Sequence, residues 1–138
     1  MKILINTIST KKITGGAFQI AQNFLLKSLE HHEIEWLYVT SKDVDDAIGD
    51  KFSALKGKRY FVFPTQPDYK RTYGKVKKEL KRIEHDLAPD LVYSITSPCY
   101  FTFNAPEVMR FTNPWVTHPN KYSWSALSIS DRIRYYLY

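Results

Sequence analysis

Cysteine is almost absent from this sequence, and so are long hydrophobic runs. The one cysteine, Cys99, has no partner for a disulfide within the chain, which suits a reducing compartment. No apolar run approaches the roughly 20 residues of a membrane-spanning helix. The strand-like start at Lys2–Asn6 is too short for the hydrophobic part of a secretory signal. We therefore expect a cytoplasmic protein.

Sequence signals for metals, named phosphate loops and nucleic acid are also missing. The four histidines and one cysteine show no metal-ligand spacing, so no metal site is expected. Neither GxGxxG nor GxxxxGK[ST] occurs. The lysines are concentrated in one segment and are not interleaved with aromatic residues along a strand, so nucleic acid is not an expected partner. The net charge of +6 still favours an anionic ligand or surface.

Five short apolar runs alternate with segments of helical periodicity, and 138 residues suffice for one domain with a core. The expected strands are Ile3–Ile5, Glu35–Thr40, Arg59–Phe63, Leu91–Thr96 and Glu107–Thr112. The expected helices are Ala17–Leu29, Asp43–Leu55 with Ser41 as its cap, and Tyr73–Leu87. Right-handed crossovers then favour strand order 3-2-1-4-5. Residues 1–138 are predicted to form a single α/β domain, a Rossmann-like, doubly wound parallel sheet.

The strand order predicts where a ligand binds. Ligands of open α/β sheets lie outside the carboxyl ends of the strands, where the order reverses, here between the first and fourth strands. The loops at that place are Thr7–Gly16, Ser97–Asn104 and Asn113–His118. In the first loop, Gly15 and Gly16 precede a helix, which lets the backbone approach a ligand and leaves first-turn N–H groups free for an anion. A tight turn alone explains the two glycines equally well.

The other two loops contribute polar and aromatic candidates. Ser97 begins the loop after the fourth strand and is a candidate substrate contact. His118 can hydrogen-bond a hydroxyl or act as a base, although an exposed loop histidine is the plainer interpretation. Asn113, Trp115 and Tyr122 are side chains of the kind that hold sugar rings, and Trp115 can instead cover the edge of the domain.

The helix expected at Tyr73–Leu87 has one narrow apolar face and is otherwise basic. Between residues 70 and 86, seven basic side chains stand against three acidic ones, a balance of +4. Such a helix can lie on anionic lipid, here through Lys75, Lys77, Lys78 and Lys81. The protein would then be peripheral at the inner face of the membrane. A plainly solvated helix face is the alternative interpretation.

The stretch ITGGAFQIAQNFL, after the first strand, resembles the start of GT-B glycosyltransferases of the retaining family 4 type. The segments APDLVYSIT and VMRFTNPW are also similar to bacterial members that build polysaccharides. The resemblance implies two Rossmann-like domains that face each other across a cleft. The amino-terminal domain mainly holds the acceptor, and the carboxyl-terminal domain holds the nucleotide sugar. This chain would be the acceptor-side domain, without the donor domain and inactive by itself.

The resemblance also implies roles for particular residues. Gly15 and Gly16 would approach the donor diphosphate or the transferred sugar. Many members have a histidine directly after the fifth strand, where this chain has Asn113 and a proline, and His118 is the candidate for that catalytic role. The substrates would be a nucleotide sugar and a glycan or lipid-linked acceptor in cell-surface polysaccharide synthesis, with no cofactor. An exposed cleft wall would also favour weak self-association of the chain.

Two other functions remain open on the residues alone. The first is a non-catalytic nucleotide- or partner-binding α/β module, complete as it stands. The second is a relative of nucleoside-diphosphate-sugar epimerases, which the missing glycine fingerprint disfavours. Binding of a nucleotide sugar by this chain alone would distinguish the module from an acceptor-side domain.

Overall fold

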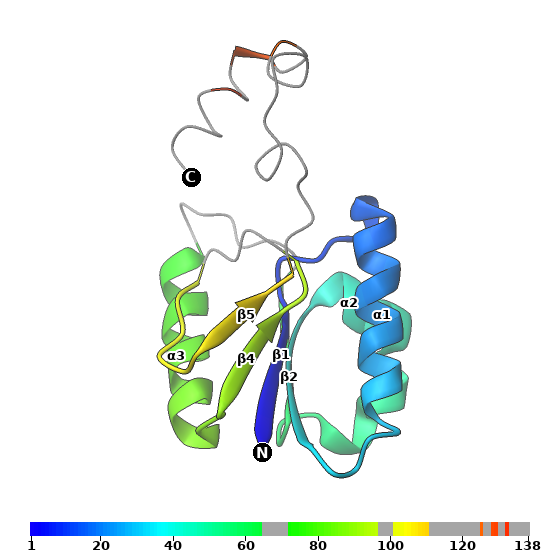
Figure 1. Cartoon of the computed structure of the whole chain (residues 1–138), viewed down its shortest axis with the longest axis vertical. Coiled ribbons are helices and arrows are strands. Elements are labelled where there is room, and N and C mark those ends of the chain that lie inside the picture. Colours follow the sequence, from blue (N-terminus) through cyan, green and yellow to red (C-terminus); the bar gives the residue numbers. More distant parts are fainter. Residues whose placement is uncertain (65–71, 97–100, 111–124, 126–127, 130–131, 133–138) are drawn as a thin grey trace.

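A computed structural model describes residues 1–64, 72–96, 101–110, 125, 128, 129 and 132 of the chain. Strands alternate with helices through this part, as Figure 1 shows. The elements are β1 (Lys2–Thr7), η1 (Lys12–Thr14), α1 (Gly16–Ser28), β2 (Glu35–Ser41), α2 (Lys42–Ile48), η2 (Gly49–Leu55), β3 (Tyr60–Phe63), α3 (Tyr73–Leu87), β4 (Leu91–Ser94) and β5 (Glu107–Met109), where η marks a 3-10 helix.

The five strands form one parallel sheet in the order β3-β2-β1-β4-β5, which confirms the predicted fold and strand order. β1 is the central strand, and its Ile5 lies in register with Tyr38 of β2 and Tyr93 of β4. Because all the strands run in the same direction, their carboxyl ends meet at one edge of the sheet, uppermost in Figure 1. We call this edge the carboxyl edge.

The helices cover both faces of the sheet. α1 and α2 pack on one face and α3 packs on the other (Figure 1). The α1 face contains a fully buried aromatic cluster, in which Phe52 of η2 stacks on Tyr60 with ring centroids 4.7 Å apart and lies 5.0 Å from the ring of Tyr38. The α3 face buries Val76 and Leu80 against strand residues of β1, β2 and β4. Each face therefore has its own core, as a parallel sheet requires.

The second helix is shorter than predicted. Its cap is the predicted one, because the Ser41 hydroxyl accepts a hydrogen bond from the amide of Val44 at 3.3 Å. The α-helix nevertheless ends at Ile48, and the chain continues as η2 from Gly49. Glycine favours such a break. An added Cβ at Gly49 would also overlap the carboxylate of Asp45, which would have to move.

A buried acid fastens the loop before β5 to α3. The carboxylate of Glu84, a residue 5% exposed, accepts hydrogen bonds from the amides of Asn104 and Ala105, the latter at 2.9 Å. It also lies 3.0 Å from Nζ of Lys81. Burial by itself raises the pKa of Glu84, but the Ala105 amide, the Lys81 ammonium and the Asn104 amide together outweigh it. The pKa of Glu84 therefore lies below its ordinary value of 4.5.

Replacing Glu84 with glutamine is expected to lower the free energy of unfolding at pH 7 by about 1–3 kcal/mol, because a neutral amide accepts weaker hydrogen bonds. The folded-state pKa lies below the unfolded value, so the carboxylate stabilises the fold above pH 4.5. This contribution is lost as the pH falls through the folded-state pKa. In urea unfolding, the difference between parent and variant should shrink below pH 4.5. Glu79→Gln, which alters an exposed ion pair, is the control. A pH-independent difference would contradict the assignment.

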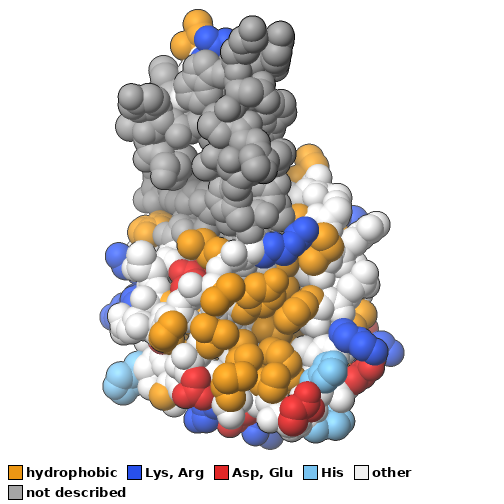
Figure 2. Space-filling model, in the orientation of Figure 1, with side chains coloured by type: hydrophobic (Ala, Val, Ile, Leu, Met, Phe, Trp, Pro, Cys, Tyr) orange, Lys and Arg blue, Asp and Glu red, His pale blue; other side chains and the backbone are white. Residues whose placement is uncertain are grey.

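None of the described helices covers the part of the α1 face that lies beyond β4. Tyr93 of β4 contacts Phe24 of α1, with ring centroids 5.1 Å apart. Beside Tyr93 in register lies Val108 of β5, which is 51% exposed, and Ile20 of α1 is 38% exposed. Hydrophobic side chains gather on this side of the molecule in Figure 2. The expected weak self-association would depend on this exposed apolar area.

Candidate functional site

Polar side chains join the ends of the three central strands at the carboxyl edge. Asn6 Nδ2 donates to Ser94 Oγ at 2.9 Å, and Asn6 Oδ1 accepts from the amide of Ile8 at 3.1 Å. Thr7 Oγ1 donates to Thr40 Oγ1 at 2.9 Å. All four of these polar side chains are buried. Buried polar groups that are satisfied in this way hold the strand ends in one geometry.

The loop after β1 is fastened to the elements on both sides of it. The carbonyl of Thr10 accepts a hydrogen bond from Ser41 Oγ at 2.6 Å, and Thr10 Oγ1 lies 2.5 Å from Thr96 Oγ1. The amide of Lys12 donates to the carboxylate of Asp43 at 2.8 Å. The chain therefore enters α1 from a fixed position next to the place where the strand order reverses, between β1 and β4.

The first turn of α1 presents bare backbone at the carboxyl edge. α1 begins at Gly16, and its first i→i−4 hydrogen bond runs from the amide of Gln19 to the carbonyl of Gly15 at 3.1 Å. Among the described residues, no acceptor is bonded to the amides of Gly16, Ala17 and Phe18. Free amides at a helix start, with the positive end of the helix dipole, attract anions.

The backbone conformation requires glycine at position 15 but not at position 16. Gly15 has φ 54° and ψ −107°, a conformation that residues with a side chain rarely adopt. Gly16 has no positive φ, and an added Cβ at Gly16 would meet no atom within 4 Å. Neither backbone conformation nor packing against the described residues therefore accounts for glycine at position 16.

A pair of alanine variants separates these two roles. Gly15→Ala is expected to lower the free energy of unfolding by about 1–3 kcal/mol, because its backbone would be strained. Gly16→Ala is expected to change it by less than about 0.5 kcal/mol, as at other uncrowded surface positions. Urea unfolding of both variants measures the difference. Equal losses in the two would show that Gly16 is also part of the turn.

The hollow beside the start of α1 is small. It has a volume of about 170 Å³ and is lined by Lys12, Phe18, Asp43, Asp46 and Ala47. Pockets for small molecules usually have volumes of about 300–1,000 Å³. A larger hollow of about 270 Å³, lined in part by His31, Trp36 and Arg59, lies at the amino ends of the strands, away from the place where such sheets bind ligands.

Several predicted site residues lie outside the described part of the chain. They are Ser97, Asn113, Trp115, His118 and Tyr122. Their roles stay predictions. In the loop between β4 and β5, the described Phe101 is 2% exposed and stacks on Tyr73 of α3, with ring centroids 5.2 Å apart. Phe101 is therefore part of the core on the α3 face.

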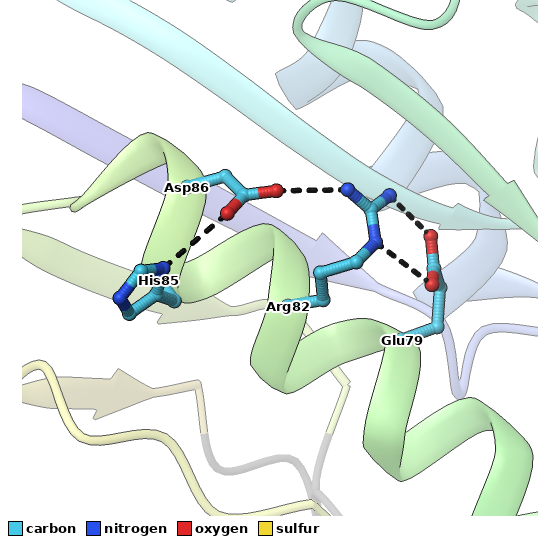
Figure 3. A network of polar contacts seen from close by, with 4 residues as sticks. All are labelled: Glu79, Arg82, His85 and Asp86. Atoms are coloured by element: carbon cyan, nitrogen blue, oxygen red, sulfur yellow. Dashed lines mark hydrogen bonds and ion pairs between the residues drawn. The ribbon is translucent and has the colours of Figure 1, made fainter.

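The basic side chains of α3 divide into paired and unpaired groups. Arg82 lies between Glu79 and Asp86, with contacts of 2.6 and 2.8 Å, and Asp86 also contacts His85 (Figure 3). Lys81 pairs with Glu84 and donates to Asn104 Oδ1 at 3.0 Å. Three exposed lysines remain without a carboxylate partner among the described residues, Lys75, Lys77 and Lys78. They lie in the half of α3 nearest the carboxyl edge (Figure 1).

Neither a metal-ligand cluster nor a membrane-spanning helix occurs among the described residues. No group of three or more histidine, cysteine, aspartate or glutamate side chains there could hold a metal ion. None of the helices in those ranges is both long and apolar enough to cross a membrane.

Comparisons of the chain with family models, with curated proteins and with solved structures found no match.

Proposed function

We propose that this chain is the acceptor-side domain of a retaining GT-B glycosyltransferase. The enzyme would move a sugar from a nucleotide sugar to a glycan or lipid-linked acceptor in cell-surface polysaccharide synthesis. The observation that carries the proposal is the start of α1, where nothing among the described residues requires glycine at position 16 or accepts a hydrogen bond from the first amides. This bare turn lies at the edge where α/β sheets of this order bind ligands.

The bare turn suits the chemistry of sugar transfer. Negative charge builds on the leaving diphosphate as the bond to the sugar breaks, and free N–H groups at a helix start stabilise such charge. The missing side chains of Gly15 and Gly16 leave room for the sugar or the diphosphate to approach. The hollow that the described residues form beside α1 is small, which supports a division of labour in which a second domain holds the nucleotide.

A non-catalytic nucleotide-binding module is the second candidate. The same free amides of α1 would suit the phosphates of a nucleotide that this chain binds without a second domain. The two functions differ in where the base and ribose of the nucleotide are held. The glycosyltransferase needs a second wall for them, whereas the module would bind the whole nucleotide with its own residues.

The unpaired lysines of α3 support a peripheral position at the inner face of the membrane. Lys75, Lys77 and Lys78 have no carboxylate partner among the described residues and lie close to the carboxyl edge. Contact of these lysines with anionic lipid would turn that edge toward the membrane, where a lipid-linked acceptor would lie. Lys81, engaged by Glu84, would add less to such contact.

Transfer of labelled sugar tests the proposed activity. The polypeptide that carries this domain together with a donor domain would be incubated with a panel of labelled nucleotide sugars and membranes that contain acceptors. Incorporation of label into lipid or glycan from one of the donors is the expected result. Absence of incorporation from every donor, with a folded protein, would overturn the proposal.

A further inference from the structure

Two hollows adjoin at the amino edge of the sheet, opposite the carboxyl edge, where the chain passes from α1 into β2 (Figure 1). Their volumes are about 270 and 280 Å³. They share four lining residues, Ser28, His31, Ile34 and Trp36. One hollow extends from there toward β3 and reaches Arg59, and the other reaches Phe24, which contacts Tyr93 of β4. We call the two hollows together the amino-edge groove.

The indole ring of Trp36 lines both hollows in a fixed orientation. Its Nε1–H donates to the carbonyl of His31 at 2.8 Å, so the one polar atom of the ring already has a partner. The ring of Phe24 lies at an angle of 87° to the indole, with ring centroids 6.3 Å apart. The Trp36 side chain is only half-buried. It therefore presents a flat, rigid apolar surface to a ligand at little further cost in side-chain entropy.

Charged side chains around the amino-edge groove are paired with one another. The pairs are Lys27 with Glu30, His31 with Glu33, and Arg59 with Glu35. Because each of these basic groups has an acidic partner, the groove exerts no strong net attraction on a charged ligand. The same exposed groups offer hydrogen-bond donors and acceptors to a neutral ligand. The charge balance therefore favours a neutral, polar ligand over an anion.

A sugar ring matches both the apolar and the polar parts of the groove. The C–H faces of the ring are apolar and pack on an aromatic surface such as Trp36, and the hydroxyls both donate and accept hydrogen bonds. A lipid chain would instead cover the charged groups without giving them hydrogen bonds, which is unfavourable. The groove therefore fits a neutral carbohydrate better than a lipid chain.

We propose that the amino-edge groove binds a neutral glycan, with one sugar ring packed on Trp36 and with hydroxyls hydrogen-bonded to Arg59 and Glu33. The 13 residues of α1, a length of about 20 Å, separate this groove from the carboxyl edge. A glycan of several sugar units can reach both places. That the bound glycan is the acceptor at the carboxyl edge rests on the proposed glycosyltransferase function, whereas the glycan contact itself does not.

Titration of the 138-residue chain with short neutral oligosaccharides tests the contact. Malto-, cello-, galacto- and N-acetylchito-oligosaccharides would be added, and the indole N–H signals of the three tryptophans followed by NMR. At least one series should bind with a Kd on the order of 1 mM and shift the signal that is missing in Trp36→Ala. That variant should bind at least about tenfold more weakly, since tryptophan anchors dominate such contacts. Shifts confined to the other two tryptophans, or no binding of any series, would overturn the proposal.

Phe61→Ala is the matched control for the tryptophan variant. Phe61 is a partly exposed aromatic residue that lines a hollow of about 260 Å³ beside β3, on the α3 face. This variant should bind the oligosaccharide as the parent does, and an equal loss in it would contradict the assignment to Trp36. Thermal unfolding of each variant shows whether it is folded.

Two further measurements test the polar part of the groove. Arg59→Gln changes an exposed side chain and should weaken binding about tenfold, because a hydrogen bond from a charged donor is lost. This test holds even if Trp36→Ala does not fold. Oligosaccharides with carboxylate or sulfate groups should bind no more tightly than neutral ones. Parent-like binding by Arg59→Gln, or tighter binding of the anionic compounds, would contradict the proposed contact.

The role of the glycan is tested in the two-domain polypeptide. There Trp36→Ala should raise KM for long glycan acceptors more than KM for short ones, because only long chains reach the groove from the carboxyl edge. An equal rise for both lengths would contradict a second contact of the acceptor. Glycan binding that depends on Trp36, in a polypeptide that transfers no sugar, would keep the groove and remove the glycosyltransferase.

Discussion

Replacing Gly16 with valine is expected to abolish sugar transfer by the two-domain polypeptide, at least about 100-fold, while the domain stays folded. The new side chain would meet no described atom within 4 Å and would face no positive-φ strain, so the fold tolerates it. In the cleft, however, it would fill the space through which the donor or the transferred sugar approaches α1. Misplacement of reacting atoms by about 1 Å can cost 10²-fold in rate.

Gly74→Val is the matched control for this experiment. Gly74 is in the first turn of α3, at the same edge of the sheet, and an added Cβ there also meets no described atom within 4 Å. This variant should transfer sugar at the parent rate. Initial rates and thermal unfolding of both variants would be measured together. Transfer by Gly16→Val at the parent rate would mean that the glycines only form a turn.

Changing Lys75, Lys77 and Lys78 together to glutamine is expected to weaken binding to anionic vesicles about 100-fold. Each lysine near an anionic surface contributes about 1 kcal/mol, and a total of about 3 kcal/mol corresponds to two orders of magnitude. Lys81 is left unchanged, because its pairing with Glu84 helps to hold the loop before β5. Co-sedimentation with vesicles of increasing anionic lipid content measures the effect.

The control for the lysine variant removes the same charge at another place. Lys51, Lys58 and Arg59 are exposed side chains of η2 and of the turn before β3. The triple glutamine variant of these residues should bind vesicles almost as the parent does. If both triple variants lose the same affinity, only net charge matters. If neither loses affinity, α3 does not contact the membrane.

The fold was predictable because its determinants are local. Apolar runs such as Ile3–Ile5 and the helical spacing of Val76, Leu80 and Ile83 are properties of neighbouring residues, and right-handed crossovers then determine the strand order. The end of α2 was predicted less well. Its helical pattern continues past Gly49, but the position of the Asp45 carboxylate over that glycine depends on the folded geometry.

Only one part of the site was predictable from the sequence, namely the turn in which glycine itself indicates an accessible backbone. Gly15 and Gly16 stand out in the sequence because glycine before a helix lets the backbone approach a ligand and leaves first-turn amides free. Trp36 instead lies within the predicted strand Glu35–Thr40, and nothing in that pattern indicates the hollows beside its ring. From the sequence alone, Glu84 is likewise only an acidic residue on a predominantly basic helix. Its amide partners, Asn104 and Ala105, lie about twenty residues further along the chain.

The central claim is that this chain forms one wall of a cleft and does not hold the nucleotide by itself. Calorimetric titration of the 138-residue chain with a panel of nucleotide sugars tests that claim most directly. We expect no saturable binding in the micromolar range, because the hollow that the described residues form beside the start of α1, about 170 Å³, is too small for a base and ribose. Saturable micromolar binding of any nucleotide sugar would contradict the claim, and a complete nucleotide-binding module would then be the better description of this domain.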